Sequence, residues 1–221
     1  MGAVEGMPVG QLLMAGGPVM IPILLCSIIA LAIIISKFLY FQRIQTDIYQ
    51  LKNKIFELVK DNKIKEVIEL CDRDPSPVAK ILKAGVLKFG CPREEIKEAM
   101  EGVSLYEVPH LEKNLNLLAT VANVTPLLGF LGTVAGMITI FYTIQSQSAS
   151  MNPVTPGDLA GGIWQALLTT AAGLMVAIPT FIAYNYCVSR VNTFVLDMER
   201  GGTELVNFLC HISESSPENL D

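Results

Sequence analysis

Two apolar stretches of the chain contain hydroxyl and amide side chains that can hydrogen-bond and position water but cannot ionise at ordinary pH. The first is VTPLLGFLGTVAGMI at 124–138 and the second is GGIWQALLTTAAGLMVAIPT at 161–180. If protons cross the membrane here, these hydroxyls could pass or position them along a polar path. A group that binds and releases the ion would have to come from another chain. The candidate path residues are Thr133, Gln165, Thr169 and Thr170.

Small residues recur along one side of the same two stretches. They follow one another at steps of three and four, which places them on one face of a helix. Small residues let the backbones of membrane helices approach closely, and Thr133 and Thr170 fall on these faces. Polar groups so placed face a bundle interior or a water-filled cavity, which favours a polar-lined pore or a partner-binding groove. The other members of the two faces are Gly129, Gly132, Gly136, Ala166, Gly173 and Ala177.

A purely structural interpretation of the threonines stays open. Pro126 and Pro179 each remove one backbone hydrogen bond, and Thr125, Thr169 and Thr180 lie near enough to help satisfy the freed groups. Each hydroxyl taken singly could also bond back to its own helix turn or join two helices. The pattern as a whole, rather than any one threonine, therefore carries the prediction of a path.

The elements that position these residues are predicted to be membrane helices. Apolar residues make up 51% of the 221-residue chain and charged residues only 17%, against roughly a quarter charged in an average soluble protein. No charge occurs in 19–36, 114–157 or 159–189. A helix needs about 20 apolar residues to cross a bilayer, so an all-α integral membrane protein is expected. The predicted spans are 19–40, 117–144 and 162–188.

Lysine and arginine are distributed on one side of these spans. Neither occurs in 1–18 or 145–161, whereas thirteen of the sixteen lie in 42–113. Cytoplasmic loops carry the excess of these residues, so the N-terminus is predicted outside and the C-terminus inside. The first span lacks a basic leader and is expected to stay as an anchor. The expected remaining segments are an outer segment 1–18, a cytoplasmic helical region 41–116, an outer loop 145–161, and a cytoplasmic C-terminal helix and tail 189–221.

The cytoplasmic part points to helical packing rather than to catalysis. Segment 42–113 has thirteen basic and thirteen acidic residues, a balance that does not favour nucleic acid. Its apolar positions recur at helical spacing, so we expect amphipathic helices packed on inward extensions of spans two and three. We find no phosphate loop, no Ser-His-Asp set and no paired catalytic carboxylates, and the five cysteines match no metal or redox pattern. We therefore expect no enzyme activity, metal or cofactor.

The two stretches resemble a known family. VTPLLGFLGTVAGMI at 124–138 and GGIWQALLTTAAGLMVAIPTFIAYN at 161–185 closely resemble the second and third spans of ExbB and TolQ, pore-forming members of the MotA/TolQ/ExbB proton-channel family. The resemblance covers about 117–190, and the first span is similar in style only. It implies a bacterial inner-membrane protein with a periplasmic N-terminus and a cytoplasmic C-terminus.

The resemblance also implies partners and site residues. The family forms a ring, a pentamer, around an ExbD- or TolR-like protein whose single span carries a titrating aspartate. Thr133 matches the threonine of the second-span GTV motif and Thr170 that of the third span, so both are expected near this aspartate. Gln165 stands where the family commonly has a glutamate. An amide can position water but cannot ionise, so an acid role at this position is in doubt.

Several functions remain open at this stage. An ExbB-like motor would drive import through a TonB-like protein, and a TolQ-like motor would maintain the envelope through a TolA-like protein. A MotA-like flagellar stator usually has four spans and a larger cytoplasmic domain, which this chain does not match. A non-conducting membrane scaffold would use the same small-residue faces for packing alone. The threonines do not distinguish H⁺ from Na⁺.

Overall fold

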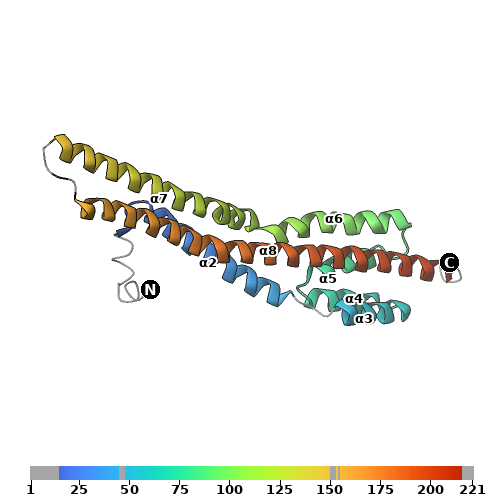
Figure 1. Cartoon of the computed structure of the whole chain (residues 1–221). Helices are drawn as coiled ribbons and strands as arrows, with labels where there is room; N and C mark the ends of the chain where they lie inside the picture. The colour runs from blue at the N-terminus through green and yellow to red at the C-terminus, as the bar shows by residue number, and fades with distance from the viewer. Residues whose placement is uncertain (1–14, 45–47, 150–152, 154, 216–221) are drawn as a thin grey trace. The chain divides into compact units, whose positions relative to one another are not determined.

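The computed structural model describes residues 15–44, 48–149, 153 and 155–215, and within them every regular element is a helix. Three helical stretches are long and apolar enough to cross a membrane, namely Met20–Arg43, Arg93–Ser148 and Leu159–Ile212. The prediction of an all-α protein with three spans is confirmed. Most of the predicted outer segment 1–18, part of the loop 145–161 and the end of the tail lie outside the described residues. The helices are α2 (Met20–Arg43), α3 (Ile48–Lys60), α4 (Ile64–Arg73), α5 (Pro77–Leu87), α6 (Arg93–Glu112), α7 (Leu115–Ala149) and α8 (Pro156–Ser215) (Figure 1).

Helix α8 runs well past the predicted membrane boundary, whereas span two is followed inward by a separate helix. Helix α8 comprises 60 residues from Pro156 to Ser215, and beyond residue 188 its sequence changes from apolar to amphipathic without a proline. Helices α6 and α7 are separated by a turn at Lys113 and Asn114, and Asn114 has a positive φ of 65°. Asparagine tolerates this left-handed conformation better than most residues. The extension of span two is thus a separate helix.

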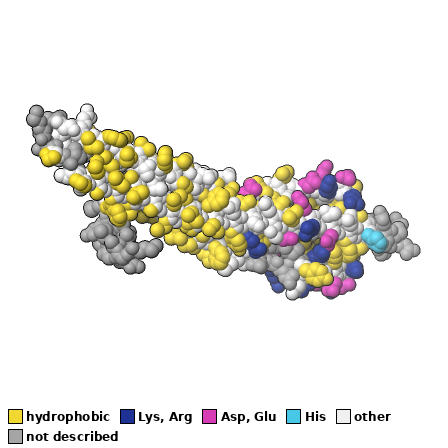
Figure 2. Space-filling view, in the orientation of Figure 1, with side chains coloured by type: hydrophobic (Ala, Val, Ile, Leu, Met, Phe, Trp, Pro, Cys, Tyr) yellow, Lys and Arg dark blue, Asp and Glu magenta, His cyan; other side chains and the backbone are white. Residues whose placement is uncertain are grey.

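The chain divides into two compact units, and the first holds the charge-free helices. It comprises the chain up to Ile35 and residues Asn114–Asn185. Ala30 and Ile33 of α2 pack with Leu118 and Val121 of α7 in a small apolar cluster. Figure 2 shows hydrophobic side chains covering most of the visible face of this unit. In a bilayer that face meets lipid or other helices rather than water.

The second unit comprises residues Ser36–Lys113 and Tyr186–Asp221 and carries most of the charges (Figure 2). Helices α3 to α6 bury one face each, as expected from their amphipathic pattern. The end of α8 supplies the apolar surface on which they pack, and Gly201 lies beside Val78 and Leu82 of α5. The largest fully buried side chains of this unit include Ile55, Leu82, Ile96, Leu111, Met198, Leu205 and Leu209.

Candidate functional site

The small-residue faces of α7 and α8 pack directly on each other. A Cβ added at Gly173 would lie 2.9 Å from Thr125 O, and one at Gly136 would lie 2.8 Å from Gly162 O. A Cβ at Gly132 would collide with the Thr169 side chain. Real Cβ atoms do not approach this closely, so the helices lie at a distance that only glycine allows at these positions.

Adjacent threonines on α8 occupy different environments at this contact. Thr169 is fully buried, and its Oγ1 donates back to the carbonyls of Gln165 at 3.1 Å and Ala166 at 2.9 Å. Thr170 is half-buried, and its Oγ1 donates across the contact to Gly129 O at 3.1 Å. The first hydroxyl therefore serves its own helix, whereas the second joins α8 to α7.

Thr133 lies on α7 one turn beyond Gly129, which packs on Thr170. It is half-buried, and its Oγ1 donates to Phe130 O of its own helix at 2.6 Å. A threonine hydroxyl has one donor hydrogen and two acceptor lone pairs. Thr133 and Thr170 each donate this hydrogen to a backbone carbonyl. The lone pairs of each hydroxyl oxygen are then left to accept a hydrogen bond from another group.

The hydroxyls beside the two prolines do not bond the carbonyls that the prolines free. A proline leaves the carbonyl four residues earlier without its helical donor. Each neighbouring threonine instead donates to the carbonyl four residues before itself. This carbonyl lies one residue away from the carbonyl that the proline frees. The prediction that these threonines satisfy the freed carbonyls is therefore wrong. The bonds are Thr125 Oγ1 to Val121 O at 2.6 Å and Thr180 Oγ1 to Val176 O at 2.7 Å.

Gln165 lies apart from the threonine pair. Its half-buried side-chain amide approaches Gly17, which has a φ of +71° in the turn before α2. A side chain at Gly17 would collide with this amide. Gln165 thus links α8 to the start of α2, a contact between segments so distant in sequence that no local pattern indicates it.

Lys37 is the first charged residue after the charge-free stretch 19–36. It is 6% exposed, and its Nζ donates to Leu111 O at 2.7 Å. Leu111 lies in the last turn of α6, where carbonyls lack helical donors and carry partial negative charge. The rings of Tyr40 and Phe41 lie 5.5 and 5.6 Å from the ammonium. The helix C-terminus and the rings thereby hold this cation.

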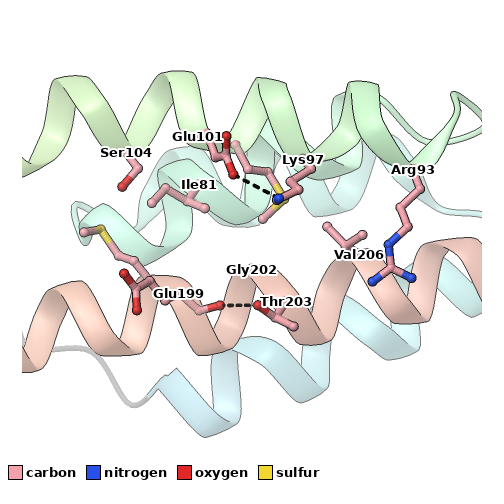
Figure 3. A pocket seen from close by; sticks show the side chains of 11 residues that line it. Ile81, Arg93, Lys97, Glu101, Ser104, Glu199, Gly202, Thr203 and Val206 are labelled. Atoms are coloured by element: carbon pink, nitrogen blue, oxygen red, sulfur yellow. Dashed lines mark hydrogen bonds and ion pairs between the residues drawn. The ribbon is translucent and has the colours of Figure 1, made fainter.

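A groove of about 340 Å³ opens in the second unit between α5, α6 and α8. Figure 3 shows its polar lining, where Lys97 Nζ lies 3.5 Å from Glu101 Oε1 and Thr203 Oγ1 donates to Glu199 O at 2.8 Å. Arg93 is engaged with Asn207 Oδ1 at 2.9 Å. The side chains of Arg93, Lys97 and Thr203 therefore already have partners within the unit. In the described part of the chain, no group of three His, Cys, Asp or Glu could hold a metal ion.

Comparison with known proteins identifies the family. The sequence pattern of the MotA/TolQ/ExbB proton channel family matches residues 73–200, which contain α5, α6, α7 and most of α8. The chain belongs to this family. The matched residues include Gly129, Thr133 and Thr170, so the α7–α8 contact lies within the part that defines the family.

Individual relatives are ExbB- and TolQ-type proteins. The chain is 32% identical over 190 residues to the biopolymer transport protein ExbB-like 3 of Synechocystis, covering 86% of this chain and 90% of that protein. It is 42% identical to ExbB of Aquifex aeolicus over 40% of this chain and 57% of that protein. It is 38% identical to the Tol-Pal system protein TolQ of Haemophilus influenzae over 48% of this chain and 46% of that protein.

The matches establish the coarse function. The chain is a multi-pass membrane protein and a proton-channel motor subunit of the ExbB/TolQ type. The family is one of transport subunits and is not a known enzyme class. Proteins of the ExbB/TolQ type work in general with ExbD/TolR-type partners.

Proposed function

We propose that the chain forms the pore of a motor in the bacterial inner membrane. In this proposal several copies, five by family resemblance, surround the single spans of an ExbD/TolR-like partner that carries the titrating aspartate. Protons moving down their gradient load and unload that aspartate, and the resulting movement delivers work to the envelope, with TonB-dependent import as the load. The N-terminus is periplasmic, and the second unit is cytoplasmic.

The polar but charge-free contact of α7 and α8 carries this proposal. Neither 114–157 nor 159–189 contains an ionisable acid or base of the Asp, Glu, Lys, Arg or His type, so the subunit itself has no group there to bind a proton. An unpaired carboxylate at mid-membrane costs at least roughly 2.5–3.5 kcal/mol. A partner aspartate at this depth is therefore favoured in its neutral, proton-loaded form, which can dock beside the half-buried hydroxyls of Thr133 and Thr170.

The hydrogen bonds of these hydroxyls favour one protonation state of the partner. Because both donate to backbone carbonyls, they offer lone pairs to a docked side chain. A lone pair accepts a hydrogen bond from a protonated carboxyl group but repels a carboxylate. Thr133 and Thr170 thus stabilise the proton-loaded aspartic acid, whereas the fully buried Thr169 serves as a helix contact. Gln165 positions the start of α2 rather than holding a proton.

The test removes the Thr170 hydroxyl in the assembled complex. Co-express the chain with its partner and compare Thr170→Val with Thr170→Ser, which keeps the hydroxyl. The valine variant should assemble with its partner yet lose most of the function that depends on the proton gradient. The serine variant should keep most of that function. Thr139→Val is the matched control, because Thr139 is exposed on α7 and bonds only its own helix at Ala135 O. Undiminished work in Thr170→Val would remove this residue from the path.

A TolQ-like load is the second candidate, since the TolQ of Haemophilus influenzae is among the relatives. Rescue of an iron-uptake defect would support the ExbB-type load, and rescue of detergent sensitivity would support the TolQ type. A non-conducting scaffold would need no aspartate partner. A neighbouring reading frame for a short protein with one aspartate-bearing span would support the motor, and its absence would support the scaffold.

A further inference from the structure

The outward face of α7 changes its chemistry along the helix. Steps of four and three residues connect six positions on this face, all of them exposed. The first three are polar and the next three are apolar. They are Asn116, Thr120 and Asn123, followed by Leu127, Phe130 and Val134.

This face lies opposite the side of α7 that packs within the chain. Leu118 and Thr125 are fully buried, and Gly132 packs on Thr169. These positions are about half a turn of the helix away from the polar stripe, at 100° per residue. On the outward face, Leu127 and Phe130 are each 66% exposed. The polar stripe therefore points away from the chain's own helices.

Lipid tails cannot hydrogen-bond the polar side chains of this stripe. The Thr120 hydroxyl donates to Asn116 O at 2.9 Å, and this bond satisfies its one donor hydrogen. An asparagine amide has two donors and an acceptor oxygen with two lone pairs, and leaving them unmet in hydrocarbon costs several kcal/mol. Asn116 stands at the edge of the predicted span 117–144, whereas Asn123 lies within it, so the exposed amide of Asn123 must meet water or another polar group.

We infer that Asn116, Thr120 and Asn123 line a water-filled vestibule that leads from the cytoplasm into the ion path. Asn123 follows the first residue of α7, Leu115, by eight positions, so the vestibule reaches about 12 Å along the helix. It ends at Leu127 and Phe130, whose apolar surfaces exclude water. Its ligand is water that solvates a proton, and its lining has no acid to trap that proton.

The role of the vestibule in conduction rests on the proposed function. Beyond Leu127 the ion leaves water and must be carried by the partner's aspartate, so the polar stripe and the threonine pair form successive parts of one route. The presence of water can nevertheless be measured without any motor activity. Failure of the vestibule is thus distinguishable from failure of the proposed motor function.

The experiment introduces single cysteines along the outward face in the complete complex. The variants are Asn116→Cys, Thr120→Cys, Asn123→Cys, Leu127→Cys and Phe130→Cys, made after alanine has replaced the native cysteines. A membrane-impermeant, positively charged methanethiosulfonate is added to the cytoplasmic side of membrane vesicles. Leu31→Cys on the apolar helix α2, where Leu31 is 59% exposed, is the control for a thiol in contact with lipid.

The polar positions should react about tenfold or more faster than position 130, because only a hydrated thiol ionises to the reactive thiolate. Equal, slow reaction at 123 and 130 would overturn the vestibule even if the complex drives work. Fast reaction at 116, 120 and 123 supports it even in a complex without a proton gradient. If Asn123→Cys fails to assemble, Thr120→Cys decides between the same two outcomes.

A functional variant sharpens the assignment. Asn123→Leu should lower proton flux through the assembled complex by about tenfold, and Asn123→Ser should restore most of it by keeping a polar side chain. Val124→Ala is the control for altered packing, because Val124 is exposed on α7 next to Asn123 but lies about 100° around the helix, away from the stripe. Normal flux in Asn123→Leu would show that the amide does not serve the route.

Discussion

In the first unit a threonine hydroxyl bonds a backbone carbonyl across the α7–α8 contact, whereas in the second a lysine and a glutamate bond each other across the α5–α6 contact. Thr170 Oγ1 donates to Gly129 O at 3.1 Å. Lys80 Nζ donates to both oxygens of Glu107, at 2.9 and 2.8 Å. The membrane unit thus joins its helices with uncharged groups that need no counterion. Under the proposed function, this uncharged contact receives the charge that another chain brings.

The largest effect is expected where the first unit depends on close backbone approach. Gly132→Leu would force a side chain into Thr169 and separate α7 from α8. Overpacking costs about 1–3 kcal/mol or more, so we expect a marked loss of thermal stability in detergent and of assembly. Gly161→Ala is the control, because a Cβ there meets nothing within 4 Å. Equal stability of Gly132→Leu and the parent would show that the contact does not hold the unit together.

The second unit should respond to loss of an ion-pair partner. Lys80→Met leaves the carboxylate of Glu107 unpaired, and this side chain is only 6% exposed. We expect a loss of about 1–3 kcal/mol in the free energy of unfolding, reduced by the 49% exposure of the lysine side chain. Adding Glu107→Gln should recover part of it. Chemical denaturation of both variants measures this, and no recovery would argue against a specific pair.

A smaller effect on stability is expected at the interhelical hydroxyl. Thr170→Val removes one hydrogen bond between α7 and α8, which in membrane proteins contributes on average about 0.6 kcal/mol. The variant should therefore stay folded and assembled although it loses work. Unfolding in detergent gives the stability, with Thr139→Val as the reference for losing a hydroxyl that bonds its own helix. A loss as large as that of Gly132→Leu would mean that Thr170 is chiefly structural.

The smallest effect concerns a thiol of the second unit. Burial, with help from Asp72 and Asp74, raises the pKa of Cys71 from 9.0 to about 11. Folding favours the neutral thiol, so the stability that Cys71 contributes is complete below pH 9 and is lost as the pH rises toward about 11. At pH 8 iodoacetamide should modify Cys71 more slowly than the partly exposed Cys91, and unfolding should abolish the difference. Equal rates in the folded protein would contradict this environment.

The sequence was sufficient to predict the three spans and the small-residue faces of α7 and α8. It could not distinguish Thr169 from Thr170, because the rotation of α8 about its axis decides which hydroxyl is enclosed. The continuation of helix beyond span three was expected, but the sequence did not give its end at Ser215. A change from lipid to water does not end a helix, so α8 continues past the predicted boundary at 188.

Long-range contacts explain the remaining differences. Gln165 approaches Gly17 and Lys37 bonds Leu111 O because helices distant in sequence are brought together, and neither contact leaves a local pattern. The outward polar stripe of α7 was not predicted, because an amide in a charge-free stretch does not by itself indicate a direction. Only the burial of the opposite face showed which way Asn123 points.

The central claim is that this subunit forms an uncharged path and that its partner supplies the acid. The direct test is proton flux into vesicles that contain either the purified chain alone or its complex with the aspartate-bearing partner. The account predicts little flux for the chain alone, flux for the complex, and loss of that flux when the partner's aspartate is replaced by asparagine. Rapid flux through the chain alone would contradict it.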